Sequence, residues 1–390
     1  MRKILCTYLA SLVIHAGCAE NPSAFGTEGF QGGASAAAGS TVASSGSSGG
    51  DETKTTVLDK RRLDYNEALR TASLKVLRVL PTLEQIRRVQ NAEDKKAEYE
   101  ASVDSMLEDP RFKARMVKFW RDAMRQGGSD LLDHSPVLAA RVSTSGAPFT
   151  DVFTATQNTC PTFADGNFLD GDCNNGVAVH AGVLTNPGSM KQFYSNMAFR
   201  RVRWVQEVFM CQKFPAEASE KPAVVDGKDY TSPWKFESIS DSPINFRDTQ
   251  SVVCANCHTT MNHIAPLLAN FDSEGMWTGS SEVFTPVLPD PVKTDMNHWL
   301  SPGEKTSWRF GVEAADLPAL GAAIADDPGM ADCVTTRLWN LVMSKEDVVN
   351  DLATIPPTVL DPLVEKFEST GMDVKETLRF MLKHDDFVNF

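Results

Sequence analysis

Apolar residues between Asp51 and Gly128 recur with the period of an α-helix. The pattern predicts several amphipathic helices whose apolar faces form part of a core. Pro81 and Pro110 stand where a proline begins a helix rather than interrupts one. Two apolar stripes are evident: Tyr99, Val103, Met106 and Leu107, and then Phe112, Met116, Phe119 and Trp120.

The helical period is lost from Leu131 to Thr185, where Gly, Asn, Asp and Thr become frequent. We expect this segment to be rich in loops. Oxygen-bearing side chains alternate around Asp165–Asn174, but their register does not fit a calcium-binding EF-hand loop. A turn cluster closed by a disulfide is the better interpretation. One helix is predicted over Ser189–Cys211, followed by loop over Pro215–Asp248.

The C-terminal part again predicts helices. One covers about Leu317–Met343 and is expected to break around Pro328. In the next, Leu363 and Phe367 would pack, and Gly371 would end it. Asp373, with Glu376 three residues later, is typical of a helix start.

The first residues have the layout of a secretory signal, with two basic residues followed by the apolar stretch Ile4–Ile14. Ala16 and Gly17 precede Cys18, an arrangement that resembles the lipobox of bacterial lipoproteins. The resemblance implies cleavage before Cys18 and attachment of a lipid to its sulfur. Since Ala19 is not aspartate, it also implies an outer-membrane location, facing the periplasm or the cell surface.

Five regions follow from these patterns. Residues 1–17 are the predicted signal peptide, and residues 18–53 are a Gly/Ser/Ala-rich linker whose composition predicts a flexible tether. Residues 54–130 form a helical module. Residues 131–248 are a loop-rich middle region with a helix and a disulfide. Residues 249–390 are a C-terminal helical region.

Composition restricts the partners. Hydrophobic residues make up 42% of the chain, enough for a sizeable core, and the net charge is −13. An acidic surface repels phosphate backbones, so no nucleic-acid partner is expected.

The sequence Cys254-Ala-Asn-Cys257-His258 has the CxxCH pattern of c-type haem attachment. Two thiols one helical turn apart can form thioethers with the two vinyl groups of one porphyrin. The adjacent histidine can bind the iron as the proximal axial ligand. The pattern therefore predicts one covalent haem c on Cys254 and Cys257, with His258 as the iron ligand, in agreement with the predicted export.

Eight cysteines are present, and four remain once Cys6, Cys18, Cys254 and Cys257 are set aside. An even remainder in an oxidising compartment allows two disulfides, with three possible connectivities. We favour the short loop between Cys160 and Cys173, and a link between Cys211 and Cys333.

Other interpretations of CxxCH stay open. A redox dithiol would be expected on a thioredoxin-like βαβ background, which the pattern lacks. A zinc site would need further ligands, one of which could be His263. A structural disulfide is the simplest alternative.

The stretch Cys254–Trp277 resembles cytochrome-like domains of unknown function that are common in planctomycetes and myxobacteria. Those domains read CxxCHxxMDPxGxxxExFDxxGxWR, whereas this chain has Asn262-His263 in place of Asp-Pro. Shorter matches extend the resemblance over most of residues 57–390. It implies a mainly α fold with long loops, a haem-bearing C-terminal region and no particular reaction. The matching positions are Met261, Ile264, Asn270-Phe-Asp272, Gly275 and Trp277.

The sixth iron ligand is open, because Met261 lies on the same helix as His258 and cannot reach the opposite haem face. The candidates are Met276, Met296, His180, His263 and His298. Methionine ligation would suit electron transfer to a redox partner protein, whose identity the sequence does not give, and an open position would suit ligand binding or peroxide chemistry.

Familiar hydrolase, metalloprotease and nucleotide-binding motifs are missing, so no catalytic residue is predicted. The first hypothesis is a lipid-anchored electron-transfer protein. The second is a lipid-anchored structural or binding protein without haem, and the third is a haem enzyme with an open distal position.

Overall fold

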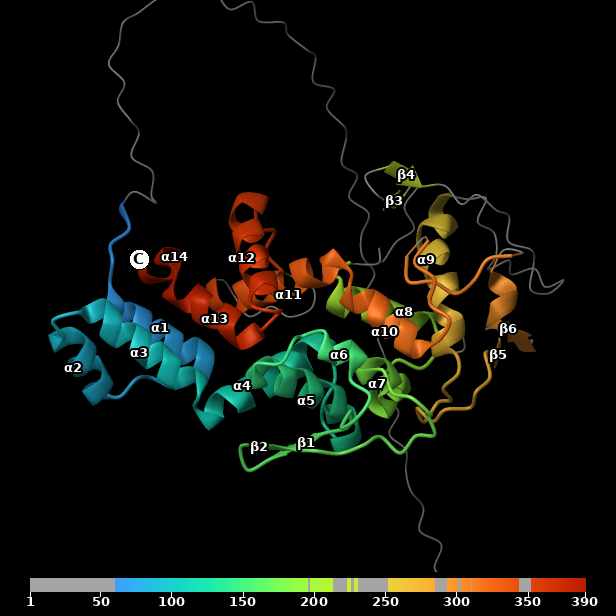
Figure 1. The fold of residues 1–390 in the computed structure, drawn as a ribbon, viewed down its shortest axis with the longest axis horizontal. Helices are drawn as coiled ribbons and strands as arrows, with labels where there is room; N and C mark the ends of the chain where they lie inside the picture. The colour runs from blue at the N-terminus through green and yellow to red at the C-terminus, as the bar shows by residue number, and fades with distance from the viewer. Residues whose placement is uncertain are drawn as a thin grey trace, which may run out of the picture. The chain divides into compact units, whose positions relative to one another are not determined.

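The computed structural model describes residues 60–195, 197–212, 223–225, 228–230, 252–284, 293–300, 303–309, 311–343 and 352–390. For residues 223–225, 228–230 and 252–259 it describes the backbone alone. All of these residues belong to one compact unit, Thr56–Phe390. The described part is mainly α-helical, as predicted, with three short antiparallel hairpins (Figure 1). The predicted signal and linker, with Cys18, lie outside the described residues.

The N-terminal helices follow the predicted pattern. They are α1 (Tyr65–Leu77), α2 (Leu83–Asn91), α3 (Lys95–Leu107) and α4 (Pro110–Met124). A side-chain oxygen accepts backbone N–H groups at the start of every one of them, which satisfies donors that have no partner inside the helix. The caps are Asp64, Thr82, Asp94 and Asp109. Both predicted apolar stripes are buried, so this prediction is confirmed.

The loop-rich expectation for Leu131–Thr185 is wrong at its start. Helix α5 covers Asp130–Ser145, and α6 (Asp151–Thr154) follows. Ser135–Ala140 are all buried, because α5 packs against α4 on one side and α7 on another. A helix buried on several sides has no polar stripe, and so the amphipathic period is absent from its sequence.

The rest of the middle region is irregular, as expected. Strands β1 (Thr162–Ala164) and β2 (Asn167–Leu169) form a hairpin, and η2 (Gly182–Thr185) is a 3₁₀ turn. Both predicted disulfides are confirmed, Cys160–Cys173 around the hairpin and Cys211–Cys333 between distant segments.

The single helix predicted over Ser189–Cys211 is two helices, α7 (Pro187–Gln192) and α8 (Phe199–Phe209). Ala198, just before α8, has a left-handed φ of 56°. The break brings the Met190 carbonyl to the Arg201 guanidinium, at 2.6 Å. In a continuous helix these residues would be separated by about 16 Å along the axis.

The C-terminal helices also match expectation. The predicted break before Pro328 separates α10 from α11, and Asp373 caps α13 by accepting the N–H groups of Lys375 and Glu376. The elements are β3 (Ala223–Val225), β4 (Lys228–Tyr230), α9 (Val252–Leu268), β5 (Glu282–Phe284), β6 (Lys293–Asp295), η3 (Met296–Trp299), α10 (Leu317–Ala325), α11 (Pro328–Met343), α12 (Pro357–Ser369), α13 (Val374–Lys383) and α14 (Asp385–Val388). Most of the loop predicted over Pro215–Asp248 lies outside the described residues.

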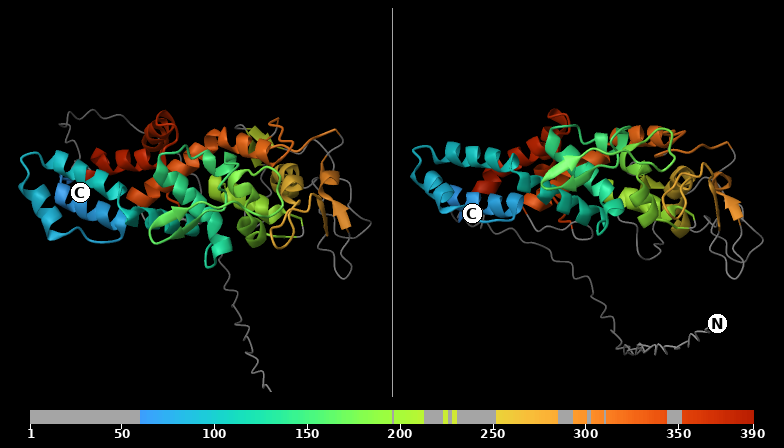
Figure 2. Two further views of the ribbon diagram at one scale, coloured as in Figure 1. Left: turned by 60° about the horizontal axis from the view of Figure 1, so that its bottom comes forward. Right: turned by 90° about the horizontal axis from the view of Figure 1, so that it is seen from below.

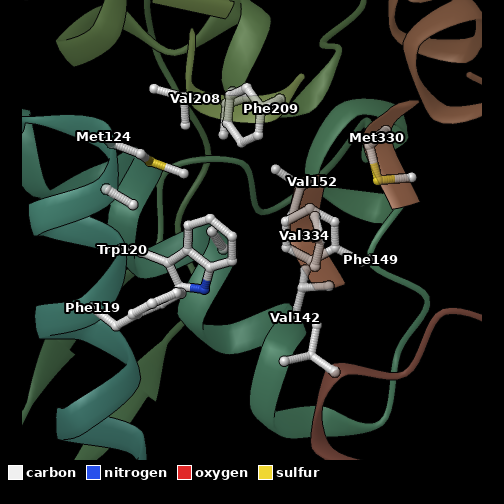
Figure 3. Close-up of a cluster of buried hydrophobic side chains, with 14 of the residues drawn as sticks. Phe119, Trp120, Met124, Val142, Phe149, Val152, Val208, Phe209, Met330 and Val334 are labelled. Carbon is white, nitrogen blue, oxygen red and sulfur yellow. The ribbon is translucent and has the colours of Figure 1, made fainter. Parts of the chain in front are cut away.

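The core joins segments that are far apart in the sequence. Figure 3 shows side chains of α4, α5, α8 and α11 meeting around Trp120 and Phe149, whose rings stack with centroids 5.1 Å apart. The last helices return to the first ones, since α13 packs against α3 and α5. The backbones of Arg62 and Phe390 exchange two hydrogen bonds of 2.7 and 2.9 Å, which join the first described residues to the last. No helix among the described residues is long and apolar enough to cross a membrane.

Candidate haem-bearing helix

Helix α9 carries the predicted attachment motif. Cys254, Cys257 and His258 lie in its first two turns, and their side chains are outside the described part of the structure. In a helical backbone, Cys257 follows Cys254 by about one turn, and His258 is the next residue. This donor set has the spacing that covalent haem attachment requires.

The second half of α9 is anchored in the core. Asn262, Ile264, Ala265 and Leu268 are fully buried, and α9 packs against α8 and η3. Because so much of this half is buried, its position is fixed by the surrounding helices. A group bound by the first two turns would therefore be attached to a helix whose other half is buried in the core.

Arg201 of α8 holds the end of α9. It is buried, and its guanidinium donates to the carbonyl oxygens of Leu268 (2.8 Å), Phe271 (2.9 Å) and Asp272 (2.8 Å), and twice to Met190. A cation is favourable at the C-terminus of a helix, where carbonyl groups lack partners. Burial lowers the pKa of Arg201 to about 10, so it stays charged at neutral pH.

The segment after α9 is a tight turn built from the residues that match the family pattern. The Asp272 carboxylate accepts the N–H groups of Glu274 (2.8 Å) and Met276 (2.9 Å). The rings of Phe271 and Trp277 meet edge to face, with centroids 5.1 Å apart. Gly275 has φ of +79°, and a Cβ there would overlap the Pro187 carbonyl oxygen. Only glycine suits this place.

Asn175 connects the turn to the middle region. Its side-chain Nδ2 donates to the carbonyl oxygens of Thr185 (2.9 Å) and Gly275 (3.3 Å), and its backbone carbonyl accepts the N–H of Trp277 (2.8 Å). The family-like residues from Phe271 to Trp277 therefore have a structural role: they fix the chain that leaves α9.

Three of the five candidates for the sixth ligand lie on α9 or on η3 beside it. His263 is buried on α9, and its Nε2 lies 2.6 Å from a Glu304 carboxylate oxygen. Met296 and His298 are on η3, and the Met296 side chain is fully buried. The structure thus gives His263 a carboxylate partner rather than a metal-binding group of side chains.

The other two candidates lie outside α9 and η3. Met276 is exposed in the turn after α9. His180 lies just before η2, with its Nδ1 3.2 Å from the Thr185 hydroxyl, and burial lowers its pKa below the ordinary value. Across the described residues, no three His, Cys, Asp or Glu side chains gather in a way that could hold a metal ion.

A cavity of about 710 Å³ lies beside the Cys211–Cys333 disulfide. Trp308, Arg309 and Asp327 are among its lining residues. The Trp308 indole donates to the Asp327 carboxylate at 2.7 Å, and Arg309 also pairs with Asp327. None of the five candidates for the sixth iron ligand is among its lining residues.

Sequence reasoning missed Arg201 and Asn175. Arg201 lies next to Val202 in a helix that is apolar on one face, and a charged residue at the edge of such a face was the only signal. Asn175 gave none, since asparagine is ordinary in a turn-rich segment.

Comparisons with known families matched two parts of the chain. Residues 52–140 match the family model PSCyt2, described as a protein of unknown function (DUF1549). Residues 175–281 match PSCyt3, also described as a protein of unknown function (DUF1588). The second match includes α8, α9 and the turn to Trp277. The two matches confirm the resemblance to domains of unknown function.

No curated protein and no solved structure gave a significant match to this chain.

Proposed function

We propose that this chain is a lipid-anchored c-type haem protein of the bacterial cell envelope that transfers single electrons. The observation that carries the proposal is the helical backbone over Val252–Leu268, which gives Cys254, Cys257 and His258 the spacing of a haem-attachment motif. Cys18 is the proposed lipid-attachment site.

The disulfides support the same proposal. Two disulfides use four of the eight cysteines, and two others lie within the first 18 residues. Cys254 and Cys257 are the pair that remains. Disulfides such as Cys160–Cys173 persist in oxidising compartments, which is where c-type haem is attached. The cysteine usage of the whole chain is thus consistent with export.

Each residue of the motif has a distinct role in this proposal. Cys254 and Cys257 would hold the porphyrin through thioethers, and His258 would bind the iron. The haem, when bound, supplies a centre that gains and loses one electron. Arg201 and the turn around Gly275 keep the following half of α9 in place. They would limit movement of the motif during electron transfer.

The test is a measurement of covalent haem on the full chain made with a c-type maturation system. We expect a pyridine haemochrome spectrum of haem c and a mass increase of one haem after denaturation. Cys254→Ser with Cys257→Ser should abolish both signals. The matched control, Cys160→Ser with Cys173→Ser, removes a confirmed disulfide and should keep the haem.

A chain without covalent haem, with Cys254 and Cys257 as a dithiol or a disulfide, would overturn the haem proposal in favour of a structural or binding protein. If haem is present, a Soret shift on adding carbon monoxide would indicate an open sixth position and contradict a carrier with two axial side chains. Cys18→Ser should abolish the lipid mass on the mature chain and its retention in salt-washed membranes; a chain with Cys18 that carries no lipid mass would contradict lipid anchoring.

A further inference from the structure

The turn between α1 and α2 exposes three large apolar side chains within five positions. The exposed fractions are 36% for Val79, 62% for Leu80 and 69% for Leu83. Leu83 has the highest exposure of any large apolar side chain among the described residues. Single exposed apolar side chains are common on soluble proteins, but several that lie close together mark an interaction surface.

The turn is held in this conformation by its own hydrogen bonds. The Ser73 hydroxyl donates to the Val79 carbonyl at 2.7 Å, and Pro81 is buried between the exposed leucines. Thr82 and Gln85 form a reciprocal capping box, with hydrogen bonds of 2.8 and 3.2 Å. The leucines are therefore presented by an ordered turn, and their exposure is a property of the fold.

The surrounding charge is opposite to that of the whole protein. Residues 75–91, which comprise the last three residues of α1, the turn and α2, contain four Lys or Arg and one Asp or Glu, a net charge of +3, and Arg88 among them pairs with Glu98 of α3. The full chain carries −13. This segment is therefore a basic region on an acidic protein, and it attracts anionic surfaces that the rest of the molecule repels.

Basic and apolar side chains share one surface at this turn. Arg87 is exposed and follows Leu83 by four positions, so the two lie on the same side of α2. Arg78 is exposed directly before Val79. Glu84 is the single acidic residue of α2. Leucines flanked by arginines are the combination that inserts into a lipid interface and contacts its headgroups.

We propose that the α1–α2 tip, defined as Arg78–Leu83 with the Arg87 side of α2, docks on an anionic membrane surface. The leucines would enter the interfacial layer, and the arginines would contact lipid phosphates. The inference rests on the membrane location in the proposed function, because the tip alone would bind only weakly. The basic charge around the turn and its fixed, hydrogen-bonded conformation favour an anionic membrane as the partner.

Docking at the tip would fix the orientation of the whole unit relative to the membrane. In the views of Figures 1 and 2, α2 lies at one end of the Thr56–Phe390 unit and α9 at the opposite end. With the tip on the membrane, α9 would point away from the lipid, toward soluble partners. A lipid on Cys18 alone, followed by a long linker, would leave that direction free.

The experiment uses the chain from Ala19 to Phe390, which lacks the predicted signal and lipid site and keeps the compact unit whole. Co-sedimentation is measured with vesicles of phosphatidylglycerol and phosphatidylcholine, and with phosphatidylcholine alone. We expect binding to the anionic vesicles that weakens with added salt. Leu80→Ser with Leu83→Ser should weaken it about tenfold, and Arg87→Gln about fivefold. The matched control, Leu169→Ser with Val179→Ser, changes two exposed apolar residues elsewhere and should have no effect.

Equal binding to both vesicle types, no binding, or equal loss in the control pair would overturn the proposal. Concentration-dependent dimers that disappear in Leu80→Ser with Leu83→Ser would also overturn it, since a second copy would then cover the tip. Circular dichroism should show that every variant keeps its helices. Because this chain cannot be lipidated, failure here is separate from failure of the Cys18 or haem proposals.

Discussion

The two family-matched regions are held together in different ways. In residues 52–140 the described chain is four helices and most of a fifth, each begun by a nearby polar cap and held mainly by apolar faces. In residues 175–281 much of the described chain between its helices is irregular, and buried polar side chains such as Arg201 and Asn175 hold it to distant backbone.

This difference predicts which polar substitutions destabilise each region most. The cap of α1 acts over two or three residues, from Asp64 to Asn66 and Glu67. Arg201 acts over 67 to 71 residues when it binds the carbonyls that follow α9. Loss of a local cap weakens one helix end, whereas loss of Arg201 leaves several buried carbonyls without donors. We therefore expect larger effects from polar substitutions in the second region.

Arg201→Met should give the largest effect, a loss of about 4 kcal/mol in the free energy of unfolding, because four carbonyl oxygens, three of them in buried contacts, lose a charged donor. The measurement is the guanidinium unfolding midpoint, together with hydrogen exchange of the α9 amides. Both should fall.

The matched control is Arg203→Met in the same helix. Arg203 is about half exposed and pairs with Glu207, so its loss should cost about 0.5 kcal/mol. Equal effects at the two positions would show that the buried contacts of Arg201 do not hold α9, and the comparison between the regions would fail.

Gly275→Ala comes next, with an expected loss of about 3 kcal/mol, because its Cβ would overlap the Pro187 carbonyl oxygen in addition to the strain of a positive φ. Gly279→Ala separates these two causes. Gly279 also has a positive φ, of 66°, but a Cβ there would meet only ordinary contacts. It should cost about 1 kcal/mol. If both variants unfold at the same denaturant concentration, the close approach to Pro187 is not what makes Gly275 necessary.

Among the three test substitutions, Asp64→Ala should give the smallest effect, about 1 kcal/mol, since it removes one helix cap in the first region. Asp64→Asn keeps an acceptor oxygen and should restore most of the stability. Thermal unfolding followed by circular dichroism measures both variants. A loss at Asp64 as large as that at Arg201 would mean that the first region also depends on single polar contacts.

The sequence predicted the first region well because its signals are local. Apolar spacing and proline positions act within about one helical turn. They predicted a helical stretch over Asp51–Gly128 with the apolar faces of α3 and α4, and the break between α10 and α11. Cysteine counting and loop length gave both disulfides. The same logic failed at α5, whose burial on several sides removes the amphipathic pattern.

In the candidate site, too, local features were predictable and long-range contacts were not. The CxxCH spacing and its place on a helix could be predicted, and the haem itself remains a proposal. The contacts that hold the helix could not be predicted, because an arginine in a sequence does not indicate which carbonyls it will meet.

The sequence by itself determined the helical class, most of the helical regions and the helix that carries Cys254, Cys257 and His258, and it favoured the cysteine pairs that the structure shows. Only the tertiary structure decided that α5 is buried, that Arg201 holds the end of α9 and that Gly275 lies against Pro187. The physical reason is how far apart in the sequence the interacting residues are. Helix periodicity and capping join residues that are neighbours in the chain, whereas these contacts join residues that become neighbours only when the chain has folded.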